Sequence, residues 1–174
     1  KVMGAVDWFE GESKRTGEPA PVGVIGYGEG GLIAFYAAAA DPRIDAAAVS
    51  GYFQEREGLW QEPIYRNVWS LLRDFGDAGV AALIAPRALA IEACVGPEAA
   101  GPPAPREGRA GAAPGRLISP LVESARREFE RVRGVYDRLG VRGRLVFADP
   151  RDGNPAPPAG VIGLLLEALG VSGQ

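Results

Sequence analysis

Histidine is absent from all 174 residues of this chain, and cysteine occurs once, at Cys94. A serine, histidine and aspartate triad needs an imidazole as its general base, so the sequence excludes such a triad. A single cysteine also excludes an internal disulfide and a thiolate metal cluster, and the missing histidine removes the commonest nitrogen ligand of zinc. The sequence therefore predicts neither a metal site nor a cofactor.

Long apolar runs and an excess of one charge sign are also missing. No run approaches the roughly 20 residues of a membrane-spanning helix, and the first residues lack the apolar segment of a signal peptide. The 19 basic and 22 acidic residues give a net charge of -3. Because these charges are interleaved, no basic face is available for phosphate backbones. We expect neither a membrane nor a nucleic acid as a partner.

The apolar content of 47% is enough for a core. The length fits the usual range of about 100 to 200 residues per domain. We therefore expect residues 1–174 to form a single α/β domain, with a flexible loop rich in Gly, Pro and Ala over residues 96–117. Lys1 opens directly on a helical pattern without an initiator methionine, so we expect the chain to begin inside a longer protein.

Helical and strand patterns alternate along the chain. Strands are predicted over residues 22–27, 44–50, 88–93 and 144–148. Helices are predicted at the amino terminus and over residues 32–40, 62–75, 78–84, 120–139 and 161–169. Ser119 and Pro120 are expected to be the N-cap and first residue of the helix that follows them. This alternation predicts a three-layer α/β/α fold around a mostly parallel sheet of about four strands.

A glycine-rich turn joins the first predicted strand to its helix, with the sequence Gly26-Tyr27-Gly28-Glu29-Gly30-Gly31. In a G-x-S-x-G nucleophile elbow, the third position of such a turn carries the reactive serine. That position is Gly28 here. An elbow holds this residue at a positive φ, a strain of about 1 to 3 kcal/mol that glycine does not suffer. The pattern is therefore typical of an elbow without its nucleophile.

The same turn also satisfies the dinucleotide fingerprint G-x-G-x-x-G through Gly26, Gly28 and Gly31, with a helix N-terminus where a pyrophosphate could bind. That fingerprint expects an acidic residue about 20 positions on, at the end of the next strand. The chain has Ser50 and Gly51 there. A Rossmann-like nucleotide-binding module thus stays an alternative. In a further alternative, the glycines only let helix and strand pack closely in a structural or interaction module.

Four segments together resemble the dienelactone hydrolase and acetyl xylan esterase-like branch of the α/β-hydrolases. They are residues 23–31, 37–45, 49–53 and 83–87, and the resemblance covers most of residues 1–95. It implies a partial α/β-hydrolase fold, in which the strands are the last four of an eight-stranded sheet. The first strand would then have an open edge, which the missing amino-terminal half or a second copy of the chain could cover. A small ester-like molecule is the ligand implied.

The resemblance also implies site residues. The nucleophile position falls on Gly28, the amide of Glu29 would be an oxyanion donor, and the acid would fall at Glu92 or Glu98. The histidine would lie after Ala148, where the chain has Asp149, Arg151, Asp152 and Asn154. Because loss of triad members lowers the rate by several orders of magnitude, we expect a protein of esterase ancestry that has lost hydrolytic competence.

Three further candidates come from the residues themselves. Glu29 could be a carboxylate nucleophile or base, although acids are common in the first turn of a helix for electrostatic reasons. Cys94 follows an apolar strand and is expected to be a buried small hydrophobe. A group of polar and aromatic residues is expected either to line a cap over the site or to pack against the sheet: Trp60, Gln61, Glu62 and Tyr65.

Overall fold

A four-stranded, fully parallel sheet forms the centre of the molecule. The computed structural model describes residues 1–108, 110–150 and 160–171. The strands β1 (Gly23–Tyr27), β2 (Ala46–Ser50), β3 (Ala88–Glu92) and β4 (Leu145–Ala148) lie side by side in the order of the sequence. The predicted parallel sheet is therefore confirmed.

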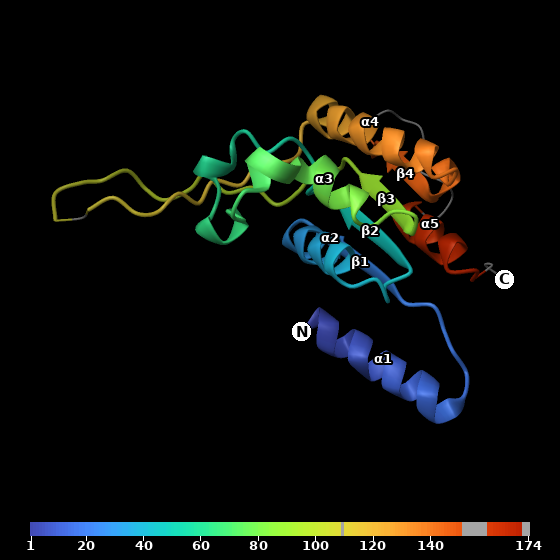
Figure 1. The fold of residues 1–174 in the computed structure, drawn as a ribbon. Coiled ribbons are helices and arrows are strands. Elements are labelled where there is room, and N and C mark those ends of the chain that lie inside the picture. Colours follow the sequence, from blue (N-terminus) through green and yellow to red (C-terminus); the bar gives the residue numbers. More distant parts are fainter. Residues whose placement is uncertain (109, 151–159, 172–174) are drawn as a thin grey trace.

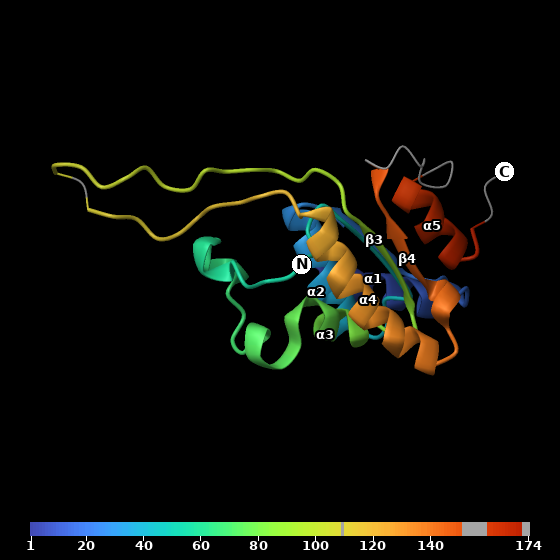
Figure 2. The same cartoon turned by 90° about the horizontal axis from the view of Figure 1, so that it is seen from above.

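Helices cover both faces of this sheet. The faces are divided among α2 (Glu29–Ala40), α3 (Gly76–Ala82) and α4 (Val122–Arg138) on one side, and α5 (Gly160–Ala168) on the other (Figures 1 and 2). Phe35, Val49 and Ile91 lie in the core on the first side, and Ala48 and Leu165 in a smaller cluster on the second. The predicted three-layer α/β/α fold is confirmed.

The register aligns the last residues of the four strands at the carboxyl end of the sheet. Tyr27 lies beside Ser50, Ser50 beside Glu92, and Glu92 beside Ala148. Each of these residues is the last of its strand, so the segments that follow the four strands all begin at the carboxyl end of the sheet. The small residues within β2 and β3 let α5 approach the sheet closely.

The first helix, α1 (Val2–Thr16), lies beyond the sheet rather than over it. It contacts α2, and its Val6 is buried in the larger core. Figure 1 shows α1 projecting past β1, the edge strand. Within the described residues, no strand lies on the outer side of β1.

The helix predicted over residues 62–75 is wrong. The segment instead forms one 3-10 turn, Ile64–Arg66, and one π-helical turn, Leu71–Phe75, and a further 3-10 turn, Leu59–Gln61, precedes it. Ser70 adopts a left-handed φ of 62°, which a right-handed helix running through this position cannot contain. The helical spacing does not mark a core face either, because among its apolar residues only Leu71 is buried.

The predicted capping role of Ser119 is also wrong. Helix α4 begins at Val122 with Leu121 as its N-cap. The Ser119 hydroxyl instead bonds the backbone of Gly96, accepting from its N–H and donating to its carbonyl. It thereby joins the two ends of the long loop between β3 and α4.

That loop projects far from the body as two extended segments (Figures 1 and 2). Ala99 and Leu117 form an antiparallel bridge near its base, with N–H to carbonyl distances of 3.0 and 2.9 Å. The structure therefore has a loop where residues 96–117 predict one, and its flexibility stays a prediction. Among the described helices, none combines the length and apolar character needed to cross a membrane.

Candidate functional site

The turn from β1 into α2 has the backbone of an elbow. Gly28 has φ 56° and ψ -117°, a backbone conformation that residues with a side chain rarely adopt. Its N–H donates to the Ser50 carbonyl at 2.9 Å, and its carbonyl accepts from the Leu32 N–H at 3.1 Å. The positive φ that the sequence predicts at this position is thus present.

Two further glycines let strand and helix meet at very short range. A Cβ at Gly26 would lie 1.9 Å from the Gly30 carbonyl oxygen, and one at Gly31 would lie 2.9 Å from the Ser50 oxygen. A Cβ at Gly30, in contrast, would project into open space. Gly26 and Gly31 therefore have a packing role that requires no ligand.

Pro97 covers the place where a nucleophile would project. A Cβ built on Gly28 would lie 2.6 Å from Pro97 Cδ and 2.8 Å from Pro97 Cγ. Real Cβ contacts are essentially never this short, so a side chain at Gly28 requires the ring to move. The turn therefore combines a positive φ at Gly28 with a proline ring packed where a side chain at this position would project.

The two candidate acids lie in different surroundings. Glu92 ends β3 and accepts a hydrogen bond from the Ser50 hydroxyl, whose oxygen lies 3.1 Å from Cys94 Sγ. Burial raises the pKa of the Cys94 thiol, which disfavours the reactive thiolate. Glu98 lies on the projecting loop, where its carboxylate accepts from the Ser119 N–H at 3.2 Å and Ser119 lowers its pKa. Of these two acids, Glu92 is the one at the carboxyl ends of the strands, where the Gly28 turn also begins.

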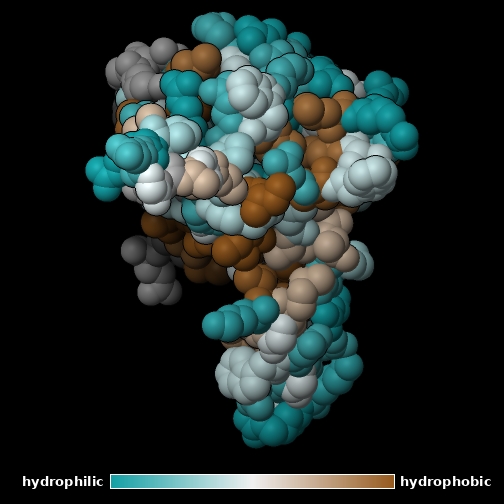
Figure 3. Space-filling model, turned by 90° about the vertical axis from the view of Figure 1, so that its left-hand side faces the viewer, coloured by the Kyte–Doolittle hydropathy of each residue, from teal (hydrophilic) through white to brown (hydrophobic). Residues whose placement is uncertain are grey.

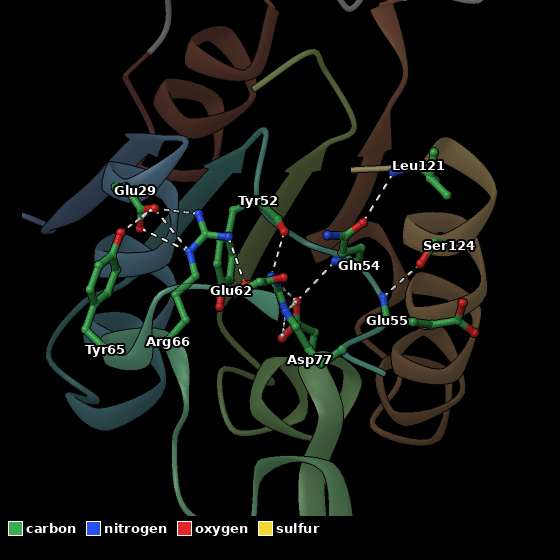
Figure 4. A network of polar contacts seen from close by, with 11 residues as sticks. Glu29, Tyr52, Gln54, Glu55, Glu62, Tyr65, Arg66, Asp77, Leu121 and Ser124 are labelled. Atoms are coloured by element: carbon green, nitrogen blue, oxygen red, sulfur yellow. Dashed lines mark hydrogen bonds and ion pairs between the residues drawn. The ribbon is translucent and has the colours of Figure 1, made fainter. Parts of the chain in front are cut away.

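Glu29 is the outer end of a charged network (Figure 4). Its Oε1 accepts from Arg66 Nη2 at 2.6 Å and from the Tyr65 hydroxyl at 2.9 Å. Arg66 Nη1 then donates to Glu62 Oε2 at 3.0 Å. The Glu29 carboxylate therefore ties the segment after β2 to the start of α2, and it is already paired.

The inner part of this network is fully buried. Arg56 and Asp77 both have side chains that are 0% exposed, and Arg56 Nη2 lies 2.8 Å from Asp77 Oδ2. The Arg56 guanidinium also stacks over the Tyr52 ring, 3.9 Å from its centre. Glu62 links the two arginines, with its Oε1 at 3.4 Å from Arg56 Nη1. Sequence analysis missed this cluster, since Arg56 and Asp77 are separated by 20 residues that follow no regular period.

The polar and aromatic group expected near the site is divided by the structure. Glu62 is buried in the charged network, whereas Trp60 is 70% and Tyr65 is 62% exposed. The Gln61 carbonyl accepts from the Arg116 N–H at 2.9 Å, which connects this segment to the base of the long loop. The exposed Trp60 and Tyr65 rings therefore do not form a layer against the sheet, and a role for this group in a cap over the site stays a prediction.

The region expected to carry the histidine is described only up to residue 150. Asp149 follows β4 directly, while Arg151, Asp152 and Asn154 lie outside the described residues. Among the residues the structure covers, no group of three or more carboxylate or thiol side chains is arranged to hold a metal ion. A cavity of about 550 Å³ lies at the opposite end of the strands, beside α5, with Asp45, Arg87 and Leu165 in its wall.

Comparison with known proteins found no matching family model and no matching curated protein. Among solved structures, the chain is similar to a carbohydrate esterase family 15 glucuronoyl esterase from Caldicellulosiruptor kristjansonii, with a TM-score of 0.53 and 18% sequence identity. The match covers 87% of this chain and 44% of the esterase, so the chain spans less than half of that protein. The likeness shows that the described α/β/α layers share their fold with part of that esterase.

Proposed function

We propose that this chain is the carboxyl-terminal half of an α/β-hydrolase of the dienelactone hydrolase type, in which the site has lost ester hydrolysis and retains binding of a ligand or partner. The observation that carries the proposal is the position of Pro97 over Gly28, where a Cβ would lie 2.6 Å from the ring. Position 28 thus has no side chain that could attack an ester, and the Pro97 ring fills the space into which one would project.

The remaining groups do not replace the lost ones. No histidine occurs anywhere in the chain. Glu92 is bonded to Ser50 rather than to a base, and Glu29 is held by Arg66 and Tyr65. The Glu29 Oε1 atom already accepts hydrogen bonds from a guanidinium and a phenol, which leaves it fewer lone pairs for attack on an ester or for accepting a proton. Ester cleavage would therefore require these contacts to break.

The dinucleotide alternative has less support. The helix N-terminus that would bind a pyrophosphate carries the Glu29 carboxylate instead, and Asp45 lies at the amino end of β2, where its Oδ2 accepts from the Val22 N–H at 2.7 Å. An acid at the opposite end of the sheet cannot bind the ribose of a nucleotide placed at the turn.

The experiment is a turnover assay on the full-length polypeptide that contains this chain, with a panel of aryl, acetyl and glucuronoyl esters. We expect no hydrolysis above the buffer rate. Turnover that Glu29→Gln or Glu98→Gln abolishes would overturn the proposal and assign an unusual catalytic carboxylate. The matched control is Glu130→Gln on the outer face of α4, an exposed acid that pairs with Arg133. Saturable binding of NAD or FAD in a parallel titration would favour the nucleotide-binding alternative.

A further inference from the structure

A proline-rich arm projects from the body between β3 and α4. Within residues 99–117, which we call the arm, every described residue from 102 to 114 is exposed, and the two segments extend far from the body (Figures 1 and 2). Its outgoing segment has the sequence Pro102-Pro103-Ala104-Pro105. Proline fixes its own φ and holds the preceding residue in an extended conformation, so this segment loses little conformational entropy when it binds a surface.

A second unusual surface lies in the connection between β2 and α3. Five large apolar side chains within residues 60–69 are between 46% and 91% exposed, and we call them the aromatic surface: Trp60, Ile64, Tyr65, Val68 and Trp69. Figure 3 looks onto this end of the molecule, where apolar side chains reach the surface among hydrophilic ones. Single exposed apolar side chains need no explanation, but a group of this size indicates a binding surface.

The arm begins beside the aromatic surface and then leads away from it. At the base of the arm, the Arg116 N–H donates to the Gln61 carbonyl at 2.9 Å, and Arg116 Nη1 donates to Gln61 Oε1 at 3.2 Å. Gln61 directly follows Trp60. The arm continues past these turns in both views, so its far end points away from the aromatic surface of the same chain (Figures 1 and 2).

The arm and the aromatic surface are chemically complementary. Proline-rich segments bind exposed aromatic rings, because the segment is already extended and its pyrrolidine rings pack on the flat aromatic faces. The chain therefore carries both halves of this pairing without bringing them together. Two copies related by a two-fold axis, with their arms antiparallel, would place the outgoing segment of each arm near the base of the other. The partner's aromatic surface lies at that base.

The exposed area is sufficient for such an assembly. A tryptophan or tyrosine side chain buries roughly 150 to 250 Å². At their observed exposure, the three rings of the aromatic surface therefore offer roughly 300 to 550 Å² on each copy. The arm that covers them loses a similar area, and a two-fold interface contains this contact twice. The total thus exceeds the roughly 1,000 Å² that a specific interface needs.

We infer that two copies of this protein associate by exchanging arms, so that residues 102–105 of each copy pack on the aromatic surface of its partner. An unrelated proline-rich protein on the aromatic surface would leave the exposed arm without a partner, whereas a second copy accounts for both surfaces. The inference goes beyond the proposed function and does not depend on whether an ester is hydrolysed.

Sedimentation equilibrium of the full-length polypeptide that contains this chain tests the association. We expect a reversible dimer whose dissociation constant rises at least about 100-fold in Trp69→Ser, because the symmetric assembly loses this ring twice. Trp69 is 91% exposed, so the variant should fold normally. Trp8→Ser is the matched control, since it removes an exposed tryptophan from α1, away from the arm (Figure 1). A monomer at all concentrations, or equal effects of the two variants, would overturn the inference.

A mixing experiment then shows whether the arm and the aromatic surface bind each other. The arm variant replaces its three outgoing prolines by glycine: Pro102→Gly, Pro103→Gly and Pro105→Gly. Its matched control makes the same kind of change in the returning segment, with Ala112→Gly and Ala113→Gly. We expect the arm variant to weaken the dimer at least about tenfold and the control to leave it unchanged.

The arm variant and Trp69→Ser are finally combined as separate chains. Each variant alone carries a defect in both contacts of its dimer. In a mixed dimer both defects fall in one contact, and the other contact is intact. We therefore expect the mixture to associate at least about tenfold more tightly than either variant alone. A mixture no tighter than the separate variants would contradict the inference, because the arm and the aromatic surface would then not be partners.

Discussion

The parallel sheet and the connection between β2 and α3 are stabilised in opposite ways. In the sheet, glycine and alanine bring backbones close together, as at Gly26, where a Cβ would lie 1.9 Å from the Gly30 oxygen. In the connection, residues 51–75, the backbone is irregular and buried charges hold it, with Arg56 and Asp77 both 0% exposed. The packing of the sheet region therefore depends on positions that carry no side chain or a very small one. The connection depends instead on a few large charged side chains that are each paired with a specific partner.

The largest effect is expected in the sheet region. Gly26→Ala places a methyl group against the Gly30 carbonyl, which is backbone and cannot swing away. We expect the variant to lose more than about 4 kcal/mol of unfolding free energy or to fail to fold. Gly30→Ala is the matched control, because open space surrounds that position and it lies in the first turn of α2. Urea unfolding should show the control within about 1 kcal/mol of the parent.

The connection should break when one member of its buried pair is removed. Asp77→Ala leaves the Arg56 charge buried without its main partner, and a loss of about 3 to 5 kcal/mol is expected. Asp74→Ala removes an exposed acid three residues earlier, which pairs with exposed Arg73, and should stay within about 0.5 kcal/mol. If the two variants unfold at the same urea concentration, the buried pair does not hold the connection.

A smaller, pH-dependent effect is expected at the loop between α2 and β2. Arg43 donates to both carboxylate oxygens of Asp41, and this contact lowers the pKa of Asp41 from 3.8 to about 2. Because the folded pKa is depressed, the stabilisation is complete above pH 4 and is lost as the pH falls toward 2. Unfolding midpoints measured across this range should fall more steeply for the parent than for Asp41→Asn. Parallel curves would contradict the assignment. The half-exposed Arg43 limits the effect to about 1 kcal/mol or less.

The same contrast explains what the sequence could and could not predict. Apolar runs and glycine turns are local signals, so the four strands and the elbow conformation at Gly28 follow from neighbouring residues. The helix expected over residues 62–75 was wrong because Ser70 adopts a left-handed φ, which the helical spacing of the apolar residues does not indicate. Ser119 fits the composition of an N-cap, yet it bonds Gly96, a partner 23 positions away. Long-range polar contacts of this kind leave no periodic trace.

The candidate site shows the same limit. The sequence predicts a positive φ at Gly28 from the glycine-rich turn, but no residue near it in the chain indicates that Pro97 packs against it. Likewise, Glu29 is read from the sequence as a first-turn acid, and only the fold brings Arg66 and Tyr65 to its carboxylate. Residue types at the site were thus accessible from the sequence, while the contacts that decide their chemistry were not.

The most direct test of this account is the stability of Gly28→Ser, alone and combined with Pro97→Gly, measured by urea unfolding. The positive φ and the contact with Pro97 should together cost about 2 to 6 kcal/mol, and Pro97→Gly should recover part of that loss in a double-mutant cycle. A Gly28→Ser variant as stable as the parent would contradict the account, because the turn would then still have room for a nucleophile.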